Sequence, residues 1–90
     1  MNVANNDLTA LPRSFCSLNR LTELNASSNS LSGLPRAFGN VNKLTKLDLS
    51  SNKLEALPNS IAALSDLWEL RCANNQLTTI PPTVSGLVNL

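Results

Sequence analysis

The chain repeats one pattern every 23 residues, without insertion or deletion. The stretch 44–66 reads LTKLDLSSNKLEALPNSIAALSD, with LTELNASSNSLSGLPRAFGNVNK 23 residues before it and LWELRCANNQLTTIPPTVSGLVN 23 residues after it. The units keep their leucines, one asparagine and one proline, while most other positions vary. A fixed period of about 20–50 residues indicates a repeat architecture, in which each unit buries its apolar face only against its neighbours.

The spacing inside one unit predicts its local structure. Leu47 and Leu49 alternate with polar residues, which is typical of a short strand with one buried face. Ile61 and Leu64 lie three apart, which fits a short helical or 3₁₀ turn. Pro58 has a fixed φ and no N–H, so it suits the entry into that turn. Each unit is therefore predicted to form one coil, and the strands of stacked coils to form a parallel sheet.

The unit L-x-x-L-x-L-x-x-N-x-L-x-x-L-P-x-x-F-x-x-L-x-x resembles the leucine-rich repeat, and the resemblance covers the whole chain. It implies an α/β solenoid: a curved right-handed coil with a short-stranded parallel β-sheet on the concave face and helical or 3₁₀ turns on the convex face. We expect one array over residues 1–90, with a partial unit at 1–20, full units at 21–43, 44–66 and 67–89, and the start of another at 90. Since no polar cap covers either end, we expect a fragment of a longer array that self-associates through uncapped ends.

One asparagine recurs at the same place in every unit, directly after the predicted strand. A carboxamide has both donors and an acceptor, and the turning backbone there loses its sheet partners. We expect each asparagine to bond its own turn and the backbone of the next coil, which is a structural role. The predicted ladder comprises Asn6, Asn29, Asn52 and Asn75.

The polar strand positions are the candidate binding surface. In one column Glu23, Lys46 and Glu69 place opposite charges about one strand apart, and weak cross-strand pairs on a solvated face remain an alternative reading. Trp68 stands where other units have threonine, and tryptophan is enriched in interface hot spots. Alternatively, Trp68 shields the open end of the stack or packs on a neighbouring coil. The predicted partner-binding residues are Trp68, Arg71, Asp48, Lys46, Glu69, Glu23 and Asn25.

Composition excludes several classes of chemistry. There is no histidine, and no Gly-rich loop or Cys/His cluster suggests a cofactor or a metal, so we expect no catalytic residues, no metal and no cofactor. The net charge is +1 without a basic run, which argues against nucleic acid, and no apolar stretch reaches the roughly 18 residues of a membrane span.

The two cysteines are expected to be unpaired. Cys72 falls in an inward column and Cys16 on the helical side more than two coils away, too far for a disulfide. Unpaired cysteines favour a reducing, cytoplasmic location. The sequon Asn25-Ala26-Ser27 lies on the concave strand, where a glycan would block binding, and this favours the same location.

The 23-residue unit with its proline looks like those of the intracellular Ras-group and Scribble-type repeat scaffolds. That resemblance implies a non-enzymatic scaffold or adaptor that binds a protein partner on the concave face, in a signalling role. Two alternatives stay open: a substrate-recruiting array of a larger enzyme, such as a kinase or ubiquitin ligase, and an extracellular recognition array.

Overall fold

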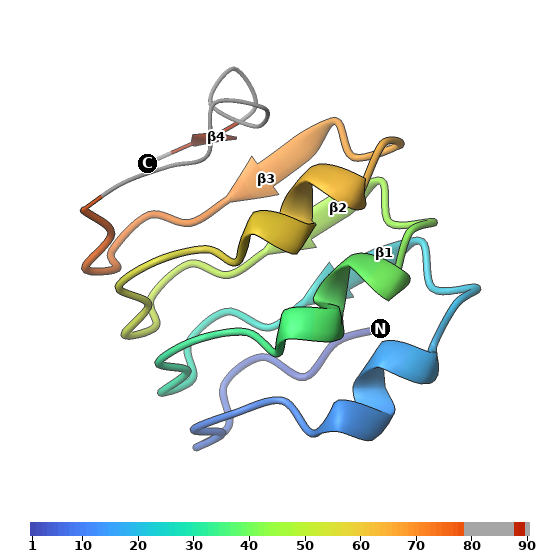
Figure 1. The fold of residues 1–90 in the computed structure, drawn as a ribbon. Coiled ribbons are helices and arrows are strands. Elements are labelled where there is room, and N and C mark those ends of the chain that lie inside the picture. Colours follow the sequence, from blue (N-terminus) through green and yellow to red (C-terminus); the bar gives the residue numbers. More distant parts are fainter. Residues whose placement is uncertain (79–87, 90) are drawn as a thin grey trace.

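A computed structural model describes residues 1–78 and 88–89 of the chain. Its elements alternate between 3₁₀ helices and strands in successive coils (Figure 1). They are η1 (Arg13–Ser17), β1 (Glu23–Asn25), η2 (Arg36–Asn40), β2 (Lys46–Asp48), η3 (Asn59–Ala63), β3 (Glu69–Arg71) and β4 (Val88–Asn89). Every helix in the described part of the chain is of the 3₁₀ type, so the helical turns expected from the repeat are tighter than an α-helix.

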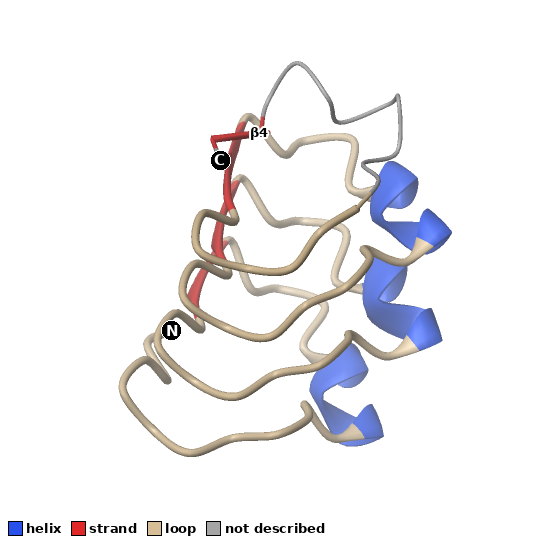
Figure 2. Ribbon diagram, turned by 90° about the vertical axis from the view of Figure 1, so that its left-hand side faces the viewer, coloured by secondary structure: helices blue, strands red, loops and turns tan. Residues whose placement is uncertain are grey.

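The strands form one parallel sheet in the order β1-β2-β3-β4. Equivalent positions of successive repeats pair with each other, since Leu24 pairs with Leu47 and Leu47 with Leu70. Asn2 adds a parallel bridge to Asn25 ahead of β1. The sheet lies along one side of the coils and the three helices along the opposite side (Figure 2). Parallel strands joined by 3₁₀ turns are the architecture of a leucine-rich repeat solenoid.

Each helix begins directly after the repeated proline. Pro12, Pro35 and Pro58 are extended at φ −68°, −62° and −66°, and each carbonyl accepts the N–H of the residue three positions later. A proline at this point loses no helical bond, because its missing N–H would have had no partner there. The prediction that the proline marks the entry to the turn is confirmed.

The repeated apolar positions fill the interior of the coils. Leu44, Leu47, Leu49, Leu54 and Ile61 of the central unit are at most 1% exposed. The rings of Phe15 and Phe38 stack between neighbouring coils with their centroids 6.2 Å apart. Since each coil contributes a single layer of side chains, burial depends on the adjacent coils, as expected for a solenoid.

One residue in each coil has a left-handed backbone, immediately before the repeated asparagine. These residues are Asn5, Ser28, Ser51 and Asn74, with φ of 59°, 56°, 58° and 58°. Asparagine tolerates this conformation better than most residues with a side chain, whereas serine has no such advantage. The sequence pattern did not reveal this feature, because the position varies between asparagine and serine.

No helix within residues 1–78 and 88–89 is long and apolar enough to cross a membrane.

Candidate partner-binding site on the sheet

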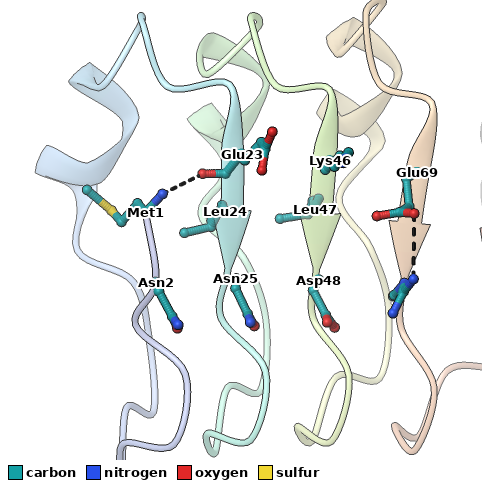
Figure 3. Close-up of a pocket in the computed structure, with 10 residues that line it drawn as sticks. Met1, Asn2, Glu23, Leu24, Asn25, Lys46, Leu47, Asp48 and Glu69 are labelled. Carbon is teal, nitrogen blue, oxygen red and sulfur yellow. Dashed lines mark hydrogen bonds and ion pairs between the residues drawn. The ribbon is translucent and has the colours of Figure 1, made fainter.

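A shallow hollow of about 400 Å³ lies over the outer side of the sheet. Side chains at the polar positions of successive strands stand around it in rows (Figure 3). Six of the seven predicted partner-binding residues line it: Glu23, Asn25, Lys46, Asp48, Glu69 and Arg71. The parallel register brings them together, because each strand presents the same positions beside its neighbour. The seventh, Trp68, is not among the lining residues and stands one residue before β3.

Trp68 is the most exposed large apolar side chain in the described part of the chain, at 59%. Its neighbour is the ammonium group of Lys46, which lies 5.2 Å from the centroid of the indole ring. This distance is within the range of a cation–π contact. Trp68 therefore does contact the neighbouring coil, but most of its surface stays open to solvent.

The charged side chains of the strands do not pair across the sheet as the column pattern suggested. Lys46 is in register with Glu23 and Glu69, yet neither carboxylate lies within ion-pair distance of it. The one ion pair in residues 1–78 joins Arg71 to Glu69 of the same strand, with 3.6 Å between Nη2 and Oε1. Asp48, the register partner of Arg71, is not in that pair. The interpretation as cross-strand ion pairs is therefore wrong here. Lys46 contacts the ring of Trp68, and Arg71 pairs with Glu69 on its own strand.

Asn25 and Asp48 have a structural contact that the sequence interpretation missed. Each uses its side-chain Oδ1 to accept the backbone N–H two residues later, that of Ser27 at 3.1 Å and that of Ser50 at 3.0 Å. Asn2 does the same for Ala4 at 2.9 Å. These bonds close Asx turns at the end of each strand. The Asx-x-Ser spacing in the first two cases is the signal that could have revealed them.

The Asx turn also occupies the sequon. The hydroxyl of Ser27 donates to Asn25 Oδ1 at 2.6 Å, and Ala26 between them is fully buried. The Asn25 amide therefore lies within a hydrogen-bonded turn of the folded sheet.

The repeated asparagines form bonds between coils along the described chain. Asn52 Nδ2 donates to its own coil at Leu49 O and Ser50 O, and to Ala26 O of the preceding coil. Its Oδ1 accepts the N–H of Leu31, also in the preceding coil, at 3.0 Å. Asn29 and Asn75 repeat the same four bonds one coil away on either side.

The direction of these bonds differs from the expectation. They reach the preceding coil rather than the next one. For Asn52, the partners in that coil are the carbonyl of Ala26, just after β1, and the N–H of Leu31. Asn6 accordingly has bonds only within its own coil, to Val3 O and Ala4 O, and it is exposed.

Both cysteines are free and buried, Cys72 inside the coil beneath β3 and Cys16 within η1. Burial raises the pKa of the Cys72 thiol. A thiol with a raised pKa is a poor nucleophile, since the thiolate is the reactive form. In the described part of the chain, no three histidine, cysteine, aspartate or glutamate side chains gather as metal ligands.

Comparisons with known proteins agree with this architecture. The family model described as "Leucine-rich repeat and WD repeat-containing protein 1, LRR" matches residues 9–87. The chain belongs to this leucine-rich repeat family. No curated protein matches the chain.

A solved structure, that of a leucine-rich repeat protein of Leptospira interrogans, is similar to the chain with a TM-score of 0.84 and 30% sequence identity. The similarity covers 97% of this chain and 24% of that protein, so the chain spans about a quarter of its solved relative. Leucine-rich repeats in general are protein-interaction modules without catalytic activity.

Proposed function

We propose that the chain is a non-enzymatic scaffold or adaptor segment that binds a protein partner through its sheet, and that the sheet is the concave face of a curved array. The observation that carries the proposal is Trp68, an apolar side chain left 59% exposed beside a polar sheet. Hydration of an exposed indole ring is unfavourable, and binding of a partner would remove that ring from water. Tryptophan and arginine are also enriched among interface hot spots.

The surroundings of Trp68 suit a hot spot. Lys46 holds one face of the ring at 5.2 Å, and Glu69 holds Arg71 in a pair on the same strand. These contacts restrict side chains that would otherwise lose conformational freedom on binding, so less entropy remains to be lost. Asn25 and Asp48 are likewise fixed by their Asx turns. The partner therefore meets a partly ordered surface.

Two alternative functions would differ from the scaffold in the kind of partner bound or in the segments that flank the repeats. A substrate-recruiting array of a larger enzyme would use the same sheet surface but bind an enzyme's substrate. An extracellular recognition array would have cysteine-rich flanking caps. We favour the intracellular scaffold, and a cytoplasmic location, because Cys16 and Cys72 are both free. The sequence of the full-length gene product distinguishes the three.

The test is site-specific crosslinking followed by measured affinity. A photo-crosslinking amino acid at Glu23 on the sheet, or at Ala62 on the helical side, is introduced into the full-length protein in its native cells. We expect the sheet position to capture a protein that the helical position does not. With that protein purified, Trp68→Ala should weaken binding about thirtyfold, which corresponds to about 2 kcal/mol.

A matched control is Asn59→Ala, an exposed change on the helical side. It should leave the affinity unchanged. If Asn59→Ala abolishes capture and Trp68→Ala does not, the binding surface is on the helical side and the proposal is wrong.

A further inference from the structure

A second charged surface lies on the side of the coils opposite the sheet. Four cations stand in two columns, one column at each end of the stacked helices η1 and η2. Arg13 and Arg36 begin the two helices, while Arg20 and Lys43 lie in the turns after them. All four side chains are exposed, and none of them forms an ion pair with any residue in 1–78 or 88–89.

The chain segments that carry these cations contain no acidic residue. Residues 8–22 and 24–47 contain no aspartate or glutamate. In the next coil the equivalent positions are Asn59 and Asp66, so the positive surface ends at η3 and its sign reverses in one column. The small net charge of the chain, +1, therefore conceals a one-sided distribution. A local field of one sign attracts a partner of the opposite sign.

The surface is also hollowed beside each column. Arg13 and Arg36, with Pro35 and Ala37, line a depression of about 490 Å³. Lys43 lines another of about 600 Å³, where the amides of Asn19, Asn40 and Asn42 supply hydrogen-bond donors. Beneath this surface the rings of Phe15 and Phe38 stack with their centroids 6.2 Å apart, so the two helices that carry the cations pack against each other. The two arginines of the first column thus line the same depression.

We propose that this basic surface binds an acidic protein segment. Arginine presents a planar fork that fits carboxylates, and it provides three of the four cations. An extended chain rises about 3.3 Å per residue, so carboxylates three residues apart are about 10 Å apart, which is comparable with the length of the five-residue 3₁₀ helix between the columns. Nucleic acid fits less well, because the surface has four cations and none of the tyrosine or tryptophan side chains on which bases stack.

The probe is a fluorescein-labelled, extended Ser/Gly peptide with glutamates three residues apart, compared with the same peptide carrying glutamines. Binding to the purified protein is followed by fluorescence anisotropy at low salt. We expect saturable binding of the glutamate peptide only, weakening steeply as salt is added, because exposed charges are screened beyond about 10 Å at 0.1 M.

The repeat itself supplies the variants. Arg13→Asn and Arg36→Asn copy Asn59, a residue that the same position tolerates in the next coil. Each should weaken binding about threefold and the two together about tenfold, as for exposed ion pairs. Lys53→Ser copies Ser30 and removes one positive charge outside the surface. It should leave the affinity within about 1.5-fold, since Lys53 follows β2 and belongs to neither column.

Three outcomes would overturn the proposal: equal binding of the glutamine peptide, an equal loss with Lys53→Ser, and binding of a single-stranded oligonucleotide or of phosphatidylserine vesicles while the glutamate peptide does not bind. The experiment does not involve Trp68 or the sheet, so its result is independent of the function proposed for that surface.

Discussion

The ammonium group of Lys46 lies 5.2 Å from the ring of Trp68, although the register partner of Lys46 on the neighbouring strand β3 is the carboxylate residue Glu69. Glu69 instead pairs with Arg71. The four side chains therefore form two contacts that link β2 to the start of β3 and stabilise the rotamers within β3. Since Trp68 remains 59% exposed, the cation covers only part of the ring and leaves the rest available.

The asparagine ladder should stabilise central coils more than the first one. Asn52→Ala removes four bonds and leaves the N–H of Leu31 without its acceptor in a buried place, so we expect a loss of about 1–3 kcal/mol in the free energy of unfolding. Asn6→Ala removes two exposed bonds within one coil and should cost less. Urea unfolding followed by circular dichroism measures both. Equal losses would contradict the ladder.

The alternation in β2 predicts opposite effects for adjacent residues. Leu47 is 1% exposed with coils on both sides, so Leu47→Ala should lower the free energy of unfolding by about 2–5 kcal/mol. Lys46→Ala, one position earlier, removes only an exposed cation–π contact and should lower it by about 1 kcal/mol or less. The same urea titration compares the two variants. A larger loss for Lys46→Ala would mean that the strand register is wrong by one residue.

The left-handed position offers a stabilising change. Ser51 has φ 58°, where asparagine is favoured over serine, and Asn74 occupies the equivalent position one coil later. Ser51→Asn should raise the free energy of unfolding by up to about 1 kcal/mol. The reverse exchange, Asn74→Ser, should lower it. Changes of the same sign in the two variants would show that backbone strain does not decide the choice at this position.

The contact between η2 and η3 depends on a glycine. A Cβ added to Gly39 would lie 2.5 Å from the carbonyl oxygen of Ser60 and 3.1 Å from the Cβ of Ala63. Gly39→Ala should therefore push the two coils apart and cost about 1–3 kcal/mol in unfolding free energy. At Gly33 an added Cβ meets nothing within 4 Å, so Gly33→Ala should be neutral or stabilising by up to about 1 kcal/mol. Calorimetric melting of both variants tests this; a Gly39→Ala protein as stable as the native one would exclude the close packing.

The sequence predicts the backbone of this protein better than its side-chain pairs. The period of 23 fixes which leucines face inward and where each proline begins a turn, because both consequences follow from one residue type at one spacing. The strand register followed for the same reason.

The side-chain contacts of the sheet could not be predicted in the same way. Lys46 can reach Trp68, Glu69 or Glu23, and such exposed contacts differ by only a few tenths of a kcal/mol. Spacing along the sequence does not decide between them. Likewise, Asn25 and Asp48 looked like free polar groups, whereas their Oδ1 atoms accept local backbone N–H groups.

Double-mutant cycles measure how strongly Lys46 is coupled to Trp68 and how strongly it is coupled to Glu69. Lys46→Met is combined with Trp68→Ala in one cycle and with Glu69→Gln in another, and the free energy of unfolding of each variant is obtained by urea titration. A cation–π contact at an exposed site contributes about 0.5–1 kcal/mol, so the Lys46–Trp68 coupling should fall in that range. The Lys46–Glu69 coupling should stay below about 0.3 kcal/mol, because that carboxylate is engaged by Arg71. If the second coupling exceeds the first, Lys46 pairs across the strands in solution, and the ring of Trp68 is then fully open to a partner.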